Sequence, residues 1–139
     1  MTYSRSFSAL ILRIRPAILG QWIKRLLFWS RQDVHVADGF FWVDMASNFG
    51  FRLTSAQGYE PETKAMLSSF LKPGMAFVDL GANEGFFSVV ASRLVGPAGR
   101  VLAIEPQSRL GSVIRRNLDL NAANNVSLAQ VAISDADGT

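Results

Sequence analysis

The chain has 139 residues, of which 49% are hydrophobic, 18% are charged and none is cysteine. This composition excludes a disordered chain, and it excludes disulfide frameworks, thiolate zinc sites and thiol nucleophiles. The formal net charge of +3 is unevenly divided, because residues 1–32 contain basic residues and no acid, whereas all 11 acids follow them. The basic charge therefore belongs to an N-terminal arm, residues 1–32, and no nucleic-acid partner is predicted.

Residues 9–29 of the arm are mostly apolar and long enough to span a bilayer, but four cations interrupt them: Arg13, Arg15, Lys24 and Arg25. Each Arg or Lys near the bilayer centre costs about 2.5–3.5 kcal/mol, which outweighs the gain from the Leu, Ile and Phe residues. We therefore expect neither a membrane-spanning helix nor a secretory signal, and we expect a cytoplasmic protein.

The arm has the pattern of a basic amphipathic helix. Pro16 suits the first turn of a helix that runs to about Ser30, with Ile18 and Trp22 on its apolar side. Such a helix either contacts a membrane peripherally through residues 9–30 or packs on its own domain or a partner. The acid-free, Arg- and Ser-rich composition also fits a mitochondrial presequence, which is a third alternative.

Residues 33–57 are predicted to form a short β-hairpin-like segment. The stretch Val34–Asp44, followed by Phe49–Leu53, is expected to form two or three short strands, with turns at Asp38-Gly39 and at Asn48. His35 is the single histidine, and without a second His or a Cys nearby it predicts no metal site.

Residues 58–139 alternate between helical and extended patterns. A helix opens at Pro61 and ends before Pro73-Gly74, and it is followed by strand 75–80, helix 85–95, strand 101–105, helix 108–121 and strand 126–133. This order predicts an α/β fold, a Rossmann-like doubly wound parallel sheet, of which about three strands are present.

The glycine loop Asp79–Gly85 lies between the first of these strands and its helix, at the edge where open α/β sheets bind ligands. Gly81 and Gly85 allow a close approach of the backbone, and the amides at the start of the helix favour an anionic group. The loop lacks the glycine spacing of dinucleotide and P-loop sites. Asp79 and Glu84 repel polyphosphates but suit a ligand that carries an ammonium or sulfonium group.

Glu105 ends the next strand, where a carboxylate can accept hydrogen bonds from both hydroxyls of an adenosine ribose. Either feature alone is common in turns and at strand ends. The loop and the acid together, in this order, predict a nucleoside ligand.

Three blocks of the sequence, Phe77–Ser88, Gly96–Pro106 and Asn117–Asn121, are similar to those of S-adenosylmethionine-dependent methyltransferases of the FkbM type. The resemblance covers about residues 58–139, and it implies the class I methyltransferase fold with S-adenosyl-L-methionine as cofactor. It implies that the methionine end of the cofactor lies at the loop and that Glu105 holds the ribose. It also implies that Pro106, Gln107 and Asp135 lie near the adenine. The cofactor-binding set is then Asp79, Gly81, Ala82, Asn83, Gly85, Phe86, Glu105, Pro106, Gln107 and Asp135.

The resemblance also implies O-methylation of a hydroxyl on a saccharide, lipid-linked or polyketide-type acceptor, and no residue is identified as the catalytic base. A seven-stranded methyltransferase sheet with its helices needs roughly 170 residues. We therefore expect residues 58–139 to be the N-terminal half of such a domain and to bind the cofactor weakly or not at all. The alternative is an inactive membrane-associated or partner-binding fragment with a remnant nucleoside-binding fold. A nicotinamide-dependent oxidoreductase is disfavoured by the absent glycine pattern.

Overall fold

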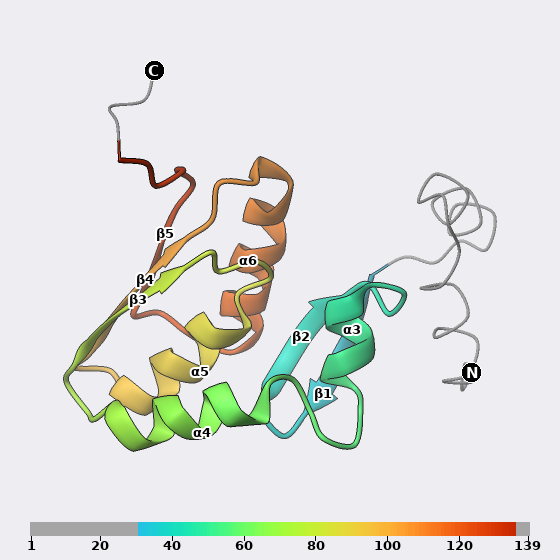
Figure 1. The fold of residues 1–139 in the computed structure, drawn as a ribbon, viewed down its shortest axis with the longest axis horizontal. Helices are drawn as coiled ribbons and strands as arrows, with labels where there is room; N and C mark the ends of the chain where they lie inside the picture. Colours follow the sequence, from blue (N-terminus) through green and yellow to red (C-terminus); the bar gives the residue numbers. More distant parts are fainter. Residues whose placement is uncertain (1–30, 136–139) are drawn as a thin grey trace. The chain divides into compact units, whose positions relative to one another are not determined.

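The computed structural model describes residues 31–135 (Figure 1), so the predictions made for the arm and for its membrane contact lie outside the described residues. No helix within this described range is long and apolar enough to cross a bilayer. The elements are β1 (Gln32–Val36), β2 (Gly39–Val43), α3 (Asn48–Leu53), α4 (Pro61–Phe70), β3 (Ala76–Leu80), α5 (Phe86–Val95), β4 (Arg100–Ile104), α6 (Ser108–Leu120) and β5 (Val126–Ala129).

The described chain divides into two compact units. Of the described residues, the first unit contains 31–36 and 41–61, and the second contains 37–40 and 62–135. Strands β1 and β2 form a two-stranded sheet around the turn at Asp38-Gly39, as the sequence predicts.

The strand expected over Phe49–Leu53 is wrong, because these residues belong to the helix α3. Ser47 caps this helix: its hydroxyl oxygen accepts a hydrogen bond from the Gly50 amide at 2.9 Å and donates one to the Asp44 carbonyl at 2.7 Å. Such a cap satisfies one of the amides that the first helical turn leaves without a partner.

The second unit is built on a parallel sheet with the strand order β3-β4-β5 (Figure 1). Its register places Asp79 beside Ala103, and Ala103 beside Leu128. The predicted alternation of strands and helices is confirmed, and Pro61 is the first residue of α4 as expected. The last strand is shorter than predicted, since β5 ends at Ala129 and not at Ile133.

Helices α5 and α6 contact each other and cover one face of this sheet, as Figure 1 shows. Successive side chains of a strand point to opposite faces, so Val101 and Ala103 are buried beneath the helices. On the other face, Val78, Leu80 and Leu102 are between 37% and 63% exposed. The second unit therefore has its core between these helices and one face of the sheet.

Ile114 on α6 is fully buried and packs beside Gly85, where a Cβ atom would lie 3.3 Å from its Cγ2 atom. Replacing it by alanine leaves a cavity between α6 and the loop. We expect Ile114→Ala to lower the free energy of unfolding by about 2–5 kcal/mol in urea titrations. The matched control Ile133→Ala removes the same atoms from a residue that is 63% exposed, and it should change stability by less than about 0.5 kcal/mol. Equal effects of the two substitutions would contradict this description of the core.

Candidate functional site

The loop between β3 and α5 follows an unusual backbone path. Gly81, Asn83 and Gly85 all adopt left-handed conformations, with φ angles of +79°, +50° and +83°. Glycine enters this region without steric cost, and asparagine tolerates it better than most other residues do. These residue types therefore explain how the chain turns from the end of β3 into α5 within five residues.

Backbone hydrogen bonds tie this loop to the neighbouring strand. The Gly81 and Ala82 amides both donate to the Ile104 carbonyl, at 2.9 and 3.0 Å, and the Gly85 amide donates to the Ala82 carbonyl at 2.7 Å. The loop is thereby held at the carboxyl end of β4, at the edge of the sheet where the sequence predicts a ligand.

Glu105 connects the loop to the start of α6. Its Oε2 atom accepts a hydrogen bond from the Asn83 amide at 2.9 Å, and its Oε1 atom accepts one from the Gln107 amide at 3.0 Å. The side chain is only 3% exposed. Because each carboxylate oxygen has two lone pairs, Glu105 retains one further acceptor position on each oxygen. The structure thus brings together the glycine loop and the acid that the sequence pairs.

Asp79 is directed toward the start of α5. Its Oδ2 atom accepts a hydrogen bond from the Ser88 hydroxyl at 2.6 Å, and the Ser88 backbone N–H also donates to this carboxylate. Burial raises the pKa of Asp79, the two hydrogen bonds from Ser88 lower it, and the negative charge of Glu105 raises it, with a net upward shift. The anionic group expected at the start of this helix is therefore Asp79 itself.

Two further polar residues, Ser88 and Asn117, donate hydrogen bonds to residues of the site. The sequence motifs alone did not assign them a role. Ser88 binds Asp79, and Asn117 on α6 donates from its Nδ2 atom to the Glu84 carbonyl at 2.8 Å. Both side chains are fully buried. The available signal was a polar residue on the apolar side of an amphipathic helix, which indicates a buried partner without identifying it.

The remaining predicted cofactor residues fall into two groups. Ala82 and Phe86 are buried within the loop and at the start of α5. Pro106 and Gln107 are exposed beside Glu105. Asp135 is exposed beyond β5, where its carboxylate accepts a hydrogen bond from the Ser134 hydroxyl at 3.4 Å. Contact of these residues with a cofactor stays a prediction.

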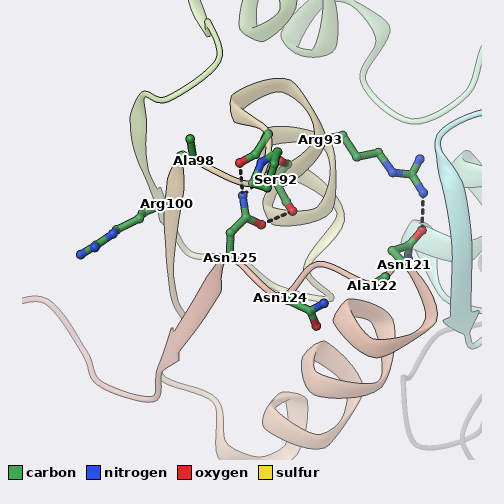
Figure 2. A pocket seen from close by; sticks show the side chains of 11 residues that line it. Ser92, Arg93, Ala98, Arg100, Asn121, Ala122, Asn124 and Asn125 are labelled. Atoms are coloured by element: carbon green, nitrogen blue, oxygen red, sulfur yellow. Dashed lines mark hydrogen bonds between the residues drawn. The ribbon is translucent and has the colours of Figure 1, made fainter.

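A pocket of about 630 Å³ lies at the opposite, amino-terminal edge of the same sheet (Figure 2). Its polar side chains bind the protein itself: Asn125 donates from Nδ2 to the Ser92 and Gly96 carbonyls, and Arg93 donates to Asn121. Figure 2 shows Arg93 turned toward Asn121 and Arg100 extended away from these groups. The pocket is a structural junction and does not coincide with the predicted site.

The loop edge fits a nucleoside ligand with a cationic tail. A Cβ atom on Gly81 would meet nothing within 4 Å, so there is open space in front of the loop. Glu105 supplies acceptor positions for hydroxyl groups, and its charge lies close enough to Asp79 to raise the pKa of that carboxyl group. Among residues 31–135 no group of three or more His, Cys, Asp or Glu side chains is placed to hold a metal ion.

A family model described as protein-L-isoaspartate(D-aspartate) O-methyltransferase matches residues 22–139. The ribosomal RNA large subunit methyltransferase E of Nitrosomonas eutropha is 39% identical over 71 residues, which are 51% of this chain and 32% of that protein. The protein-L-isoaspartate O-methyltransferase of Methanothrix thermoacetophila is 34% identical over 70 residues, which are 49% of this chain and 33% of that protein. The chain thus spans about a third of the length of these relatives.

Solved structures support the fold. The crystal structure of M. jannaschii TYW2 in complex with AdoMet, 22% identical in sequence, superposes with a TM-score of 0.55 over 71% of this chain and 42% of that chain. A Pyrococcus horikoshii protein, 18% identical, superposes with a TM-score of 0.56 over 73% of this chain and 36% of that chain. The described sheet and helices have the methyltransferase-like Rossmann fold.

The buried charge of Asp79 makes stability depend on pH. Because the pKa of Asp79 is raised in the folded state, the folded chain binds this proton more tightly than the unfolded chain, and Asp79 lowers stability as pH rises through the window above 3.8. We expect Asp79→Asn to raise the melting temperature at pH 7 and to have little effect at pH 3. Thermal unfolding across this range is the measurement. The control Asp119→Asn removes an acid from an exposed position of α6 and should change the melting temperature at pH 7 only slightly. A less stable Asp79→Asn variant at pH 7 would contradict the prediction.

Proposed function

The chain belongs to the protein-L-isoaspartate(D-aspartate) O-methyltransferase family, and we propose that its second unit binds the family's cofactor, S-adenosylmethionine, at the carboxyl ends of β3 and β4. The observation that supports this most directly is Glu105, which fixes the glycine loop while it keeps an acceptor position on each oxygen. In this proposal those two positions accept the hydroxyls of the ribose.

In this proposal the remaining residues of the loop bind the amino-acid part of the cofactor. The open space in front of Gly81 admits the amino-acid part of the cofactor close to the backbone. Asp79 and Glu84 favour its positive charges. When bound, the cofactor supplies a methyl group on a sulfonium, which is electrophilic enough to react with an aligned oxygen nucleophile. The protein contributes placement and charge.

The proposed acceptor is the free α-carboxylate of an isoaspartyl residue in a protein, and the family model supports this choice because it matches residues 22–139. A carboxylate is already nucleophilic, whereas a hydroxyl acceptor requires a base. A second candidate is ribosomal RNA, supported by the 39% identity with the methyltransferase of Nitrosomonas eutropha. This relative keeps a nucleic-acid partner open, although the charge pattern did not predict one.

The comparisons do not support the more specific expectations from the sequence, which stay proposals: the FkbM type, the hydroxyl acceptor, the cytoplasmic location and the membrane contact. The matched family and the relatives above are protein and ribosomal RNA methyltransferases, so they support methyl transfer but not the FkbM type or a saccharide, lipid-linked or polyketide hydroxyl. The cytoplasmic location and the peripheral membrane contact of residues 9–30 are supported by the sequence pattern alone.

Cofactor binding is tested with two glycine substitutions that carry the same backbone strain. Gly81 and Gly74 have φ angles of +79° and +85°, and a Cβ atom on either would meet nothing within 4 Å. Alanine at each position should cost about 1–2 kcal/mol of stability. We expect the 139-residue chain to bind S-adenosylhomocysteine weakly but saturably in NMR titrations. Gly81→Ala should weaken this binding about tenfold, because the added methyl group occupies the space of the ligand, and Gly74→Ala should not.

The expected chemical-shift changes lie at residues 79–86 and 105–107. Saturable binding that perturbs only the residues of the pocket at the amino-terminal edge would contradict the placement of the site. The absence of any saturable shift in the unchanged chain would contradict the proposed function of this chain.

The acceptor is tested by offering tritiated S-adenosylmethionine with an isoaspartyl peptide, the same peptide containing ordinary aspartate, or a ribosomal RNA fragment. We expect base-labile label in the isoaspartyl peptide at a rate about tenfold or more above its aspartyl control. If only the RNA is labelled, the isoaspartyl acceptor is refuted and ribosomal RNA becomes the proposed acceptor. Absence of label from every acceptor would contradict methyl transfer by this chain.

A further inference from the structure

Ser88 lies behind the proposed cofactor site, on the third residue of α5, and its side chain is fully buried. Its hydroxyl donates to Asp79 Oδ2 at 2.6 Å, and its backbone N–H donates to the same carboxylate. From this geometry we infer that Ser88 is a positioning residue that fixes and orients the Asp79 carboxylate for cofactor binding. The inference rests on the proposed function, because it concerns the charge that the loop presents to the cofactor.

The start of α5 explains why this contact is needed. The residue before the helix is Gly85, which has no side chain and makes no capping hydrogen bond. The first turn of a helix leaves its amides without partners, and here Asp79, which belongs to the preceding strand, supplies the missing acceptor. The partial positive charge at this end of the helix also favours a carboxylate.

The two hydrogen bonds from Ser88 oppose two effects that favour a neutral carboxyl group. Burial raises the pKa of Asp79, and the negative charge of Glu105, at the end of β4, raises it further. Glu84 is a further acid in the loop sequence. A hydroxyl that donates to a carboxylate stabilises its charged form and fixes its rotamer, and such charge-assisted bonds are about twice as strong as neutral ones.

Ser92 provides a matched control one helical turn further along α5. Its side chain is also buried, and its hydroxyl donates to Asn125 Oδ1 at the amino-terminal edge of the sheet. Residues four apart lie on the same face of a helix, so alanine at either position removes a buried hydroxyl from the same surface of α5. Of these two serines, Ser88 is the one whose hydroxyl donates to Asp79.

The test compares Ser88→Ala, Ser88→Thr and Ser92→Ala in the full 139-residue chain. Two quantities are measured across pH: the affinity for S-adenosylhomocysteine by NMR, and the titration of the Asp79 carboxyl carbon. We expect Ser88→Ala to weaken binding at pH 7 about tenfold. It should also raise the pKa of Asp79, so that binding is lost at a higher pH on acidification. Ser88→Thr keeps the hydroxyl and should restore both properties, and Ser92→Ala should change neither.

An unchanged affinity and an unchanged Asp79 titration in Ser88→Ala would overturn the inference while leaving the proposed function in place. Equal losses of binding in Ser88→Ala and Ser92→Ala would overturn it too, since they would indicate general damage to α5. If Ser88→Ala does not fold, Ser88→Cys preserves the side-chain volume with a weaker donor and should give an intermediate affinity. A wild-type chain that does not bind refutes the proposed function, and this inference with it.

Discussion

The loop of the second unit is shaped by two buried acidic side chains, whose oxygen atoms accept hydrogen bonds from backbone amides of the loop and of the helix starts. Asp79 binds the first turn of α5, and Glu105 binds the loop at Asn83 and the start of α6 at Gln107. Buried charges are costly unless they are hydrogen-bonded, and buried amides are costly without acceptors. The amides therefore give the buried acids their hydrogen-bond donors, and the acids give the amides their acceptors. These hydrogen bonds fix the left-handed loop between β3 and α5.

This arrangement determines how the proposed site can work. The backbone path of the loop is held by the Ile104 carbonyl and by Glu105, so a ligand meets a surface whose shape is already set by the chain. Binding then costs less conformational entropy than the ordering of a flexible loop would. The negative charge is stabilised from the protein side, through Ser88 and the amides, and its outward effect favours a cationic ligand over a polyphosphate.

The sequence predicts the architecture of this unit well because local signals agree there. Apolar strands, amphipathic helices and a glycine loop follow one another in a single order, and an acid ends each of the first two strands. The segment Phe49–Leu53 shows where such reasoning fails. Its five residues are short enough for the apolar side chains to fit both a strand and a helix, and the cap at Ser47 favours the helix. Sequence reasoning also could not assign partners to Ser88 and Asn117, since those partners lie on other elements and are brought close only by packing.

The amino-terminal and carboxyl edges of the sheet differ in how far their polar groups are already hydrogen-bonded within the protein. At the amino-terminal edge the pocket is large, but Asn125 bonds to the Ser92 and Gly96 carbonyls, and Asn121 joins Arg93 to the backbone of Phe40. Gly39 lies so close to Asn121 that a Cβ atom on Gly39 would collide with the side-chain amide oxygen of Asn121. The polar groups at this junction are therefore packed against each other. At the carboxyl edge, by contrast, Gly81 faces open space and Glu105 keeps acceptor positions beside it. A ligand gains more from acceptors that the protein has not fully used than from volume lined by groups already bound to one another, and this difference supports the proposed site at the carboxyl edge.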